Sequence, residues 1–137
     1  MRDLHNNVKA VRALSPAAAI TNNTALVSEI IDTLGYGSLE FVILTGSLAD
    51  TDATFTVLVE DGDVSTLSDS AAVADDYLLG TEVAAAPLFS DDNKVFKIGY
   101  CGPKRYVRLT ITPAANTGDV YIAAVALLGH PAVSPAA

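Results

Sequence analysis

The sequence predicts an all-β protein that folds as a single-domain antiparallel β-sandwich. Seven or eight short segments are either continuously apolar or alternate between apolar and polar residues, and Gly, Pro, Asn and Asp turns separate them. No segment shows a strong helical period. The small and β-branched apolar residues, with no Trp and only 7% aromatic residues, suit two closely packed sheets. At 137 residues, the chain has the size of one domain and can bury a core without disulfides or a structural metal.

The expected strands follow one another along the middle of the chain. They lie at residues 25–32, 39–44 (LEFVIL), 54–60 (TFTVLVE), 63–66, 82–89, 95–99, 105–112 (RYVRLTIT) and 120–128 (VYIAAVALL). Asp61 and Gly62 tolerate positive φ angles and predict a hairpin turn between the third and fourth of these segments. The continuous runs LEFVIL and VYIAAVALL are typical of central strands, whereas TFTVLVE and RYVRLTIT keep one polar face.

The segment RYVRLTIT shows the clearest alternation. Val107, Leu109 and Ile111 are expected to face the core, which leaves Tyr106 and Arg108 together on the exposed face of the strand.

The two ends of the chain are expected to lie outside the sandwich. Residues 1–16 are polar and locally basic and end at Ser15-Pro16, so they predict a flexible N-terminal arm. Residues 130–137 contain two prolines and predict a C-terminal tail. The sandwich itself is then expected to span residues 17–129.

Charge is strongly segregated along the chain. No Lys or Arg lies between Leu14 and Asn93, and fourteen of the sixteen acidic residues fall between Glu29 and Asp92. Residues 94–108 carry five basic residues and no acidic one. This pattern predicts surfaces of opposite sign that suit docking to a partner or to a second copy, although an acidic surface also keeps an apolar domain soluble. The net charge of −8 argues against a nucleic-acid partner.

The sequence contains no enzyme signature, and we expect neither catalytic residues nor a cofactor. It lacks a phosphate-binding Gly loop, a nucleophile elbow and zinc-type spacing. Cys101 is the only cysteine, and both histidines, His5 and His130, lie near the chain ends. We therefore predict a structural or incidental thiol. The apolar run at 120–128 is far shorter than the ~20 residues of a spanning helix, and no signal peptide is recognisable, so no membrane partner is expected.

Two weaker interpretations remain open. The acidic loops at residues 60–63 and 91–93 offer oxygen ligands for calcium, although neither has EF-hand spacing, and we predict no metal site. Tyr100, Tyr106 and Tyr121 would suit a sugar-stacking platform, with Tyr100 and Tyr106 as surface aromatic candidates. The alternative function is therefore a carbohydrate-binding head-fibre or adhesin module.

Four stretches of the sequence resemble a known family. SLEFVILTGSLADTDATFTVLVEDGD, DDYLLGTE, APLFSDDNKVFKIGY and KRYVRLTITPAANTGDVYIAAVALLGHP are similar to the small structural proteins encoded in tailed-phage and prophage head modules. These are the capsid cement, or decoration, proteins, and the best-known representative is similar to the cement protein of a Bordetella short-tailed phage. The resemblance covers residues 14–131.

The resemblance implies a jelly-roll domain that sits as a homodimer on the outside of an icosahedral capsid and clamps neighbouring major capsid subunits. It implies no active-site residue. It also implies synthesis in the bacterial host cytoplasm and a final location on the virion. The capsid-binding candidates are the basic residues of the arm and of the second basic stretch: Arg2, Lys9, Arg12, Lys104, Arg105 and Arg108.

Overall fold

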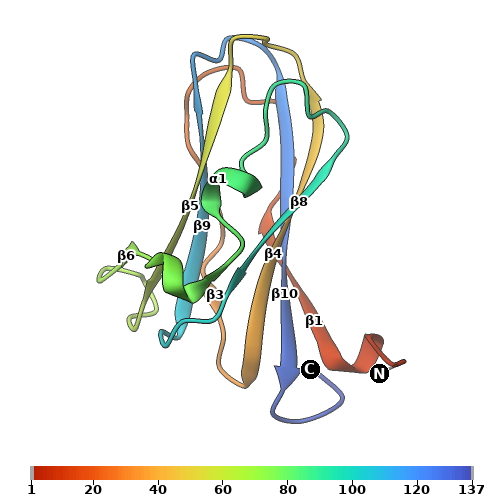
Figure 1. Cartoon of the computed structure of the whole chain (residues 1–137), viewed down its shortest axis with the longest axis vertical. Helices are drawn as coiled ribbons and strands as arrows, with labels where there is room; N and C mark the ends of the chain where they lie inside the picture. Colours follow the sequence, from red (N-terminus) through yellow and green to blue (C-terminus); the bar gives the residue numbers. More distant parts are fainter. Residues whose placement is uncertain (1, 137) are drawn as a thin grey trace.

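Two antiparallel sheets pack face to face in the computed structural model, which describes residues 2–136 (Figure 1). Sheet A has the strand order β1-β10-β4-β8-β7, and sheet B has the order β2-β9-β5-β6, with β3 also paired to β9. The strands are β1 (Val8–Leu14), β2 (Leu26–Val27), β3 (Ile31–Asp32), β4 (Tyr36–Leu48), β5 (Thr54–Gly62), β6 (Ala71–Ala72), β7 (Leu78–Leu79), β8 (Val95–Tyr100), β9 (Tyr106–Ala114) and β10 (Val120–Pro131). The short helices are η1 (His5–Asn7), η2 (Asp75–Tyr77) and α1 (Glu82–Ala85).

The strand pairing is that of a jelly roll. The first strand pairs with the last, β1 with β10, and the pairing then moves inward along the chain: β2 and β3 with β9, β4 with β8, and β5 with β6. These concentric pairs form one long folded ribbon, and successive pairs alternate between the two sheets. The expected jelly-roll β-sandwich is confirmed.

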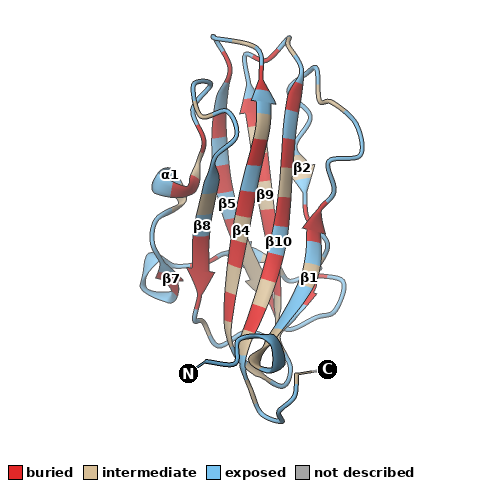
Figure 2. Cartoon of the chain, turned by 90° about the vertical axis from the view of Figure 1, so that its right-hand side faces the viewer, coloured by how far each residue is buried: buried red, intermediate tan, exposed pale blue. Residues whose placement is uncertain are grey.

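Alternation along the long strands builds the core between the sheets. Val107, Leu109 and Ile111 of β9 are completely buried, as predicted, and Phe41 and Ile43 of β4 face them from sheet A. Figure 2 shows this alternation as buried and exposed bands along β4 and β10.

The predicted N-terminal arm is wrong for most of its length. Residues 8–14 form β1, an edge strand that pairs with β10 from Val8 opposite Gly129 to Leu14 opposite Ala124. Ala13 and Leu14 are buried in the core. An edge strand carries charged residues to discourage further pairing, and Lys9 and Arg12 made this strand resemble a polar arm.

The predicted C-terminal tail also begins too early. Strand β10 continues through Gly129 to Pro131, which lies opposite Tyr36. The residues that follow are held by backbone hydrogen bonds: the Ala132 N–H donates to Gly35 O at 2.8 Å, and the Ala136 N–H donates to Asn6 O at 2.7 Å.

The predicted hairpin at Asp61-Gly62 is wrong, since both residues lie inside β5. The chain turns later, in a loop held by the Asp69 carboxylate, which accepts hydrogen bonds from the Asp63 and Val64 N–H groups. The return strand is β6, paired opposite Glu60 and Asp61.

Two further elements differ from the expected strands. Residues 82–89 begin with the helix α1, where the Thr81 hydroxyl accepts a hydrogen bond from the Ala84 N–H. Residues 25–32 form the two short strands β2 and β3, because the buried Ser28 interrupts the pairing with β9. The Ser28 hydroxyl accepts from the Leu109 N–H at 2.9 Å and donates to Glu29 O at 2.8 Å.

Candidate functional site

The segregated charges of the sequence come together in the fold as intrachain ion pairs. In every described pair, a basic residue from the N-terminal segment or from residues 94–108 binds an acidic residue from the stretch 29–92. The pairs are Arg12–Glu29 (3.0 Å), Lys94–Asp91 (3.0 Å), Lys104–Asp63 (2.8 Å), Arg105–Asp32 (2.8 Å) and Arg108–Glu60 (3.1 Å). Much of the positive charge predicted to face a partner is therefore already balanced within the chain.

The candidates near the N-terminus differ from one another in their pairing. Arg2 and Lys9 are exposed, and neither makes an ion pair within residues 2–136. Arg12 is exposed as well, but its guanidinium binds Glu29 and donates to the Ser15 hydroxyl at 3.1 Å. Arg2 and Lys9 therefore keep the most freedom to contact another protein.

Lys104 and Arg105 lie between β8 and β9, and both contact acidic neighbours. Arg105 makes a two-pronged contact with Asp32 through Nε (2.8 Å) and Nη2 (2.9 Å). The hydrogen bonds from Arg105 lower the pKa of the Asp32 carboxyl, and that carboxylate in turn raises the pKa of Arg105. The hydrogen bond with Asp63 likewise raises the pKa of Lys104. These exposed pairs are weak, so a partner can exchange them for its own contacts.

Arg108 lies on the outer face of sheet B, as predicted, but it is half-buried. It sits opposite Glu60 of β5, and its Nη2 donates to Glu60 Oε1 at 3.1 Å. The Arg108 Nε is buried and lacks a hydrogen-bond partner among the described residues. Arg108 is therefore held against its own sheet more firmly than the other candidates.

Tyr100 is not a surface aromatic residue, so that prediction is wrong. Its ring packs in the core at 4% exposure, and its hydroxyl donates to Asp61 Oδ2 at 2.6 Å and accepts from the Lys104 N–H at 3.0 Å. Tyr100 lies between Leu39 of β4 and Leu78 of β7 in sheet A, and the sequence alone does not bring these residues together.

The three tyrosines do not form one platform. Tyr106 lies half-buried on β9 of sheet B, with the Arg105 guanidinium 5.0 Å from its ring centre. Tyr121 is exposed on β10 of sheet A, and Tyr100 is in the core. The sugar-stacking surface predicted from their sequence positions is therefore not assembled by these residues.

The acidic loops considered for calcium are occupied by structural contacts. Asp61 binds Tyr100, and Asp63 binds Lys104. Asp91 accepts from the Leu88 N–H and from Lys94, and Asp92 accepts from the Leu48 N–H. No group of three or more His, Cys, Asp or Glu side chains in residues 2–136 is arranged to hold a metal ion.

The outer faces of the two sheets differ, and the sequence interpretation missed this difference. On sheet B the outward positions of β5 and β9 include several threonines and the pair Glu60–Arg108. On sheet A the outward positions are mostly apolar. The outer face of sheet A, which we call the apolar face, comprises Val42, Leu44, Val95, Ala123, Val125 and Leu127, with Glu40, Lys97, Gly99 and Leu79 beside them.

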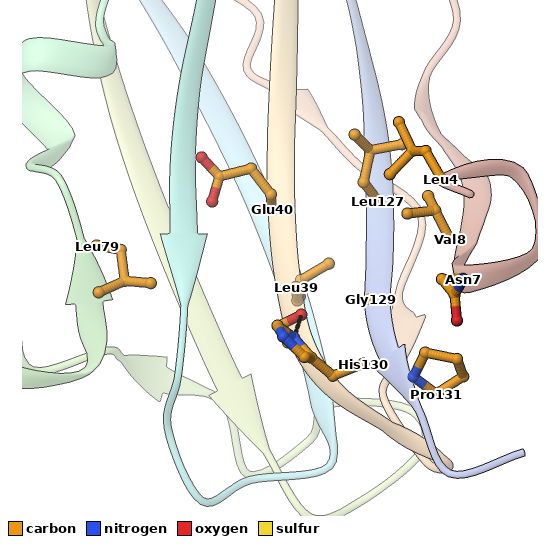
Figure 3. Close-up of a pocket in the computed structure, with 11 residues that line it drawn as sticks. Leu4, Asn7, Val8, Leu39, Glu40, Leu79, Leu127, Gly129, His130 and Pro131 are labelled. Atoms are coloured by element: carbon orange, nitrogen blue, oxygen red, sulfur yellow. Dashed lines mark hydrogen bonds between the residues drawn. The ribbon is translucent and has the colours of Figure 1, made fainter. Parts of the chain in front are cut away.

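The apolar face contains a groove of about 330 Å³ at the end nearest η1 (Figure 3). Leu4 and Leu127 line one side of the groove, and Leu79 lines the other. Glu40 is turned from β4 towards β8 and lies over Gly99, where a Cβ atom would collide with the carboxylate. Burial in this groove raises the pKa of Glu40, and the nearby Lys97 partly opposes that effect.

Comparisons with known proteins reveal the fold but no family. No family model matches the chain, and no curated protein matches its sequence. Among solved structures, the VP2 subviral particle of infectious bursal disease virus has a TM-score of 0.51 at 11% identity, covering 91% of this chain and 32% of VP2. The SPBc2 prophage-derived protein YomS has a TM-score of 0.45 at 14% identity, covering 88% of this chain and 93% of YomS.

A carbohydrate-binding module of family 35 from an environmental isolate is also similar, with a TM-score of 0.48 at 12% identity, covering 90% of this chain and 81% of that module. Identities this low show a shared fold and nothing about activity. The class that the comparisons define is therefore the β-sandwich that also occurs in a viral capsid protein. Within residues 2–136, no helix has the length and apolar character needed to cross a membrane.

Proposed function

We propose that this chain is a bacteriophage capsid cement, or decoration, protein. It binds the outer surface of the icosahedral head as a homodimer and clamps neighbouring major capsid subunits, which stabilises the shell against the pressure of packaged DNA. Its partners are the major capsid protein and a second copy of itself. In this proposal it performs no catalysis and binds neither nucleic acid nor membrane directly. It is made in the bacterial host cytoplasm and acts on the virion.

The observation that carries this proposal is the agreement between the fold and the sequence resemblance. The resembling stretches cover β4, β5, β8, β9 and β10, among them the four longest strands of the sandwich, and these assemble into the jelly roll that the resemblance implied. The VP2 similarity adds that a viral capsid protein contains a sandwich of this kind.

The exposed basic residues at the N-terminal end supply a contact for the shell. Arg2 and Lys9 have no intrachain ion pair among the described residues, and Lys104 and Arg105 have only exposed ones. Each such contact contributes little by itself. A dimer that presents two copies of the basic surface binds through effective concentration, so many weak clamps add up over a shell.

The direct test is binding to capsids that lack this chain. Purified protein is mixed with expanded shells of the major capsid protein that lack this chain, and the shells are sedimented. We expect the chain to sediment with the shells. We expect the Arg2→Glu and Lys9→Glu variants each to bind more weakly, with Lys94→Glu as a charge-matched control outside the candidate set. A chain that stays in the supernatant at every concentration contradicts the proposal.

A further inference from the structure

The apolar face of sheet A is an unusual surface for a lone domain. Its members include Leu44, Val95 and Val125, which are 51%, 63% and 41% exposed. They come from three neighbouring strands and lie side by side, because Leu44 pairs with both Val95 and Ala123. A contiguous exposed apolar patch of this kind marks an interaction site.

Residues that lie opposite one another on β10, β4 and β8 form rows across this face. Two neighbouring rows carry one charged residue each, and the two charges have opposite signs. The first row places Leu127, Glu40 and Gly99 next to one another on β10, β4 and β8. The second row, two residues further along β4, places Val125, Val42 and Lys97 next to one another.

Glu40 and Lys97 are both without an ion pair in the described chain, although most other basic residues have one. Glu40 lies over Gly99, where the missing side chain leaves room for the Glu40 carboxylate beside Leu79. A half-desolvated carboxylate in an apolar groove is stabilised by a cation from outside.

From these features we infer that the apolar face of sheet A packs against the same face of a second copy, with Lys97 of each copy beside Glu40 of the other. A two-fold axis that runs across the strands, midway between the two rows, produces this arrangement. It places each row of one copy over the other row of its partner. Lys97 of one copy then lies opposite Gly99 of the other and faces the Glu40 carboxylate that covers this glycine.

The same axis makes the shapes of the two halves complementary. The residues that line the groove at the end near η1 include the small pair Ser38 and Gly129, which lie opposite each other on β4 and β10. The opposite end of the face is raised by Leu44 and Val95. The two-fold operation seats the raised pair of one copy against the groove of the other, as a self-complementary interface requires.

This inference rests on the dimer of the proposed function and is independent of capsid binding. The other basic residue of the face, Arg12, is already paired with Glu29 and lies at its β1 edge. Lys97 is therefore the residue that distinguishes this arrangement from a face that associates through apolar contacts alone.

Charge reversal with mixing tests the inference. A Lys97→Glu homodimer would bring two carboxylates together at each contact, and a Glu40→Lys homodimer would bring two ammonium groups together. We expect each variant alone to dimerise at least about tenfold more weakly than the wild type, measured by sedimentation velocity. In an equimolar mixture, the heterodimer of the two variants has no like-charge contact at these positions.

The mixture therefore has a defined outcome. In the heterodimer, the new carboxylate of one variant faces the new ammonium group of the other, and the native Glu40 of the first faces the native Lys97 of the second. Both contacts then join opposite charges. We expect the mixture to form heterodimers, detected by native mass spectrometry with one variant isotope-labelled.

Control substitutions locate the contact on this face. Val125→Asp, at the centre of the face, is expected to abolish the dimer, whereas Val83→Asp on α1, at a position 86% exposed, leaves it unchanged. Circular dichroism confirms that each variant is folded. Dimers that form in the mixture of Lys97→Glu and Glu40→Lys, but not in either variant alone, support the inference.

Two results overturn it. If all the variants dimerise like the wild type, the dimer uses another surface, and the proposed function stands. If the wild type remains monomeric at every concentration, both the inference and the dimer of the proposed function fail, while shell binding, measured separately, still decides the capsid role.

Discussion

The Tyr100 hydroxyl donates a hydrogen bond of 2.6 Å to the Asp61 carboxylate and so joins the two sheets of the sandwich. Tyr100 ends β8 in sheet A, and Asp61 lies near the end of β5 in sheet B. The same hydroxyl accepts the Lys104 N–H at 3.0 Å, which fixes the turn into β9. Burial, reinforced by the bond to Asp61, raises the pKa of Tyr100, so the hydroxyl stays protonated and remains a donor.

Tyr100→Phe is expected to destabilise the fold by about 2 kcal/mol, because a hydrogen bond to a charged group is lost and the Lys104 N–H loses its acceptor. Urea unfolding at neutral pH measures the change. Tyr121→Phe, on an exposed ring, is the matched control and is expected to stay within about 0.5 kcal/mol of the wild type. Equal effects from the two variants would show that the link between the sheets contributes nothing.

Ser28→Ala is expected to lower the free energy of unfolding by roughly 1–3 kcal/mol. The Ser28 hydroxyl is the acceptor for the Leu109 N–H in the centre of β9, where β2 and β3 leave a gap in the pairing. Without it, a buried N–H has no partner. Thermal or urea unfolding of Ser28→Ala beside the exposed control Ser90→Ala measures the effect, and an unchanged midpoint for both contradicts this role.

Asp32→Asn is expected to make the free energy of unfolding change less when the pH falls into the acid range. Because Arg105 lowers the pKa of Asp32 in the folded state, the stabilisation is present above the unfolded value of about 3.9 and is lost as the pH falls through the folded value. The wild type should therefore exceed Asp32→Asn in urea midpoint at pH 7, and the gap should close as the pH falls through the lowered pKa of Asp32.

Asp76→Asn, an exposed change on η2, is the matched control for this series. A gap between the wild type and Asp32→Asn that is the same at neutral and acid pH would mean that the Arg105 contact is not the origin of the shift.

Glu40→Gln is expected to have opposite effects on the monomer and on the dimer. Burial raises the pKa of Glu40, so ionised Glu40 destabilises the folded monomer above that pKa, and the penalty disappears as the pH falls below the unfolded value of about 4.3. At dilutions where the protein is monomeric, Glu40→Gln should raise the urea midpoint at pH 7 but not near about pH 3. At higher concentrations it should weaken the dimer. A lower monomer midpoint at pH 7 would contradict this account.

The long inner strands were predictable because their environment is simple. In β9 one face packs against the core and the other faces solvent. Apolar residues at every second position therefore predict both the strand and its buried side chains, which are Val107, Leu109 and Ile111. The short strands and edges were not predictable, because their pairing depends on distant partners. Strand β1 needs β10, and the break at Ser28 needs Leu109, which is 81 positions away in the sequence.

The candidate site was predicted only in part for the same reason. Sequence position identified the basic residues but not their partners, since the Arg105–Asp32 pair is separated by 73 positions. The apolar face did leave a signal. LEFVIL and VYIAAVALL are almost continuously apolar, which we interpreted as burial on both faces, whereas the outward residues Leu44 and Val125 are exposed in the described chain.

Cryo-electron microscopy of shells incubated with the purified chain tests the central claim most directly. We expect density for jelly-roll sandwiches on the outer surface, present as two-fold pairs that bridge neighbouring major capsid subunits. Shells that bind no such density at saturating concentrations of the chain, or that carry it only on their inner surface, would contradict the claim that this protein is a capsid cement.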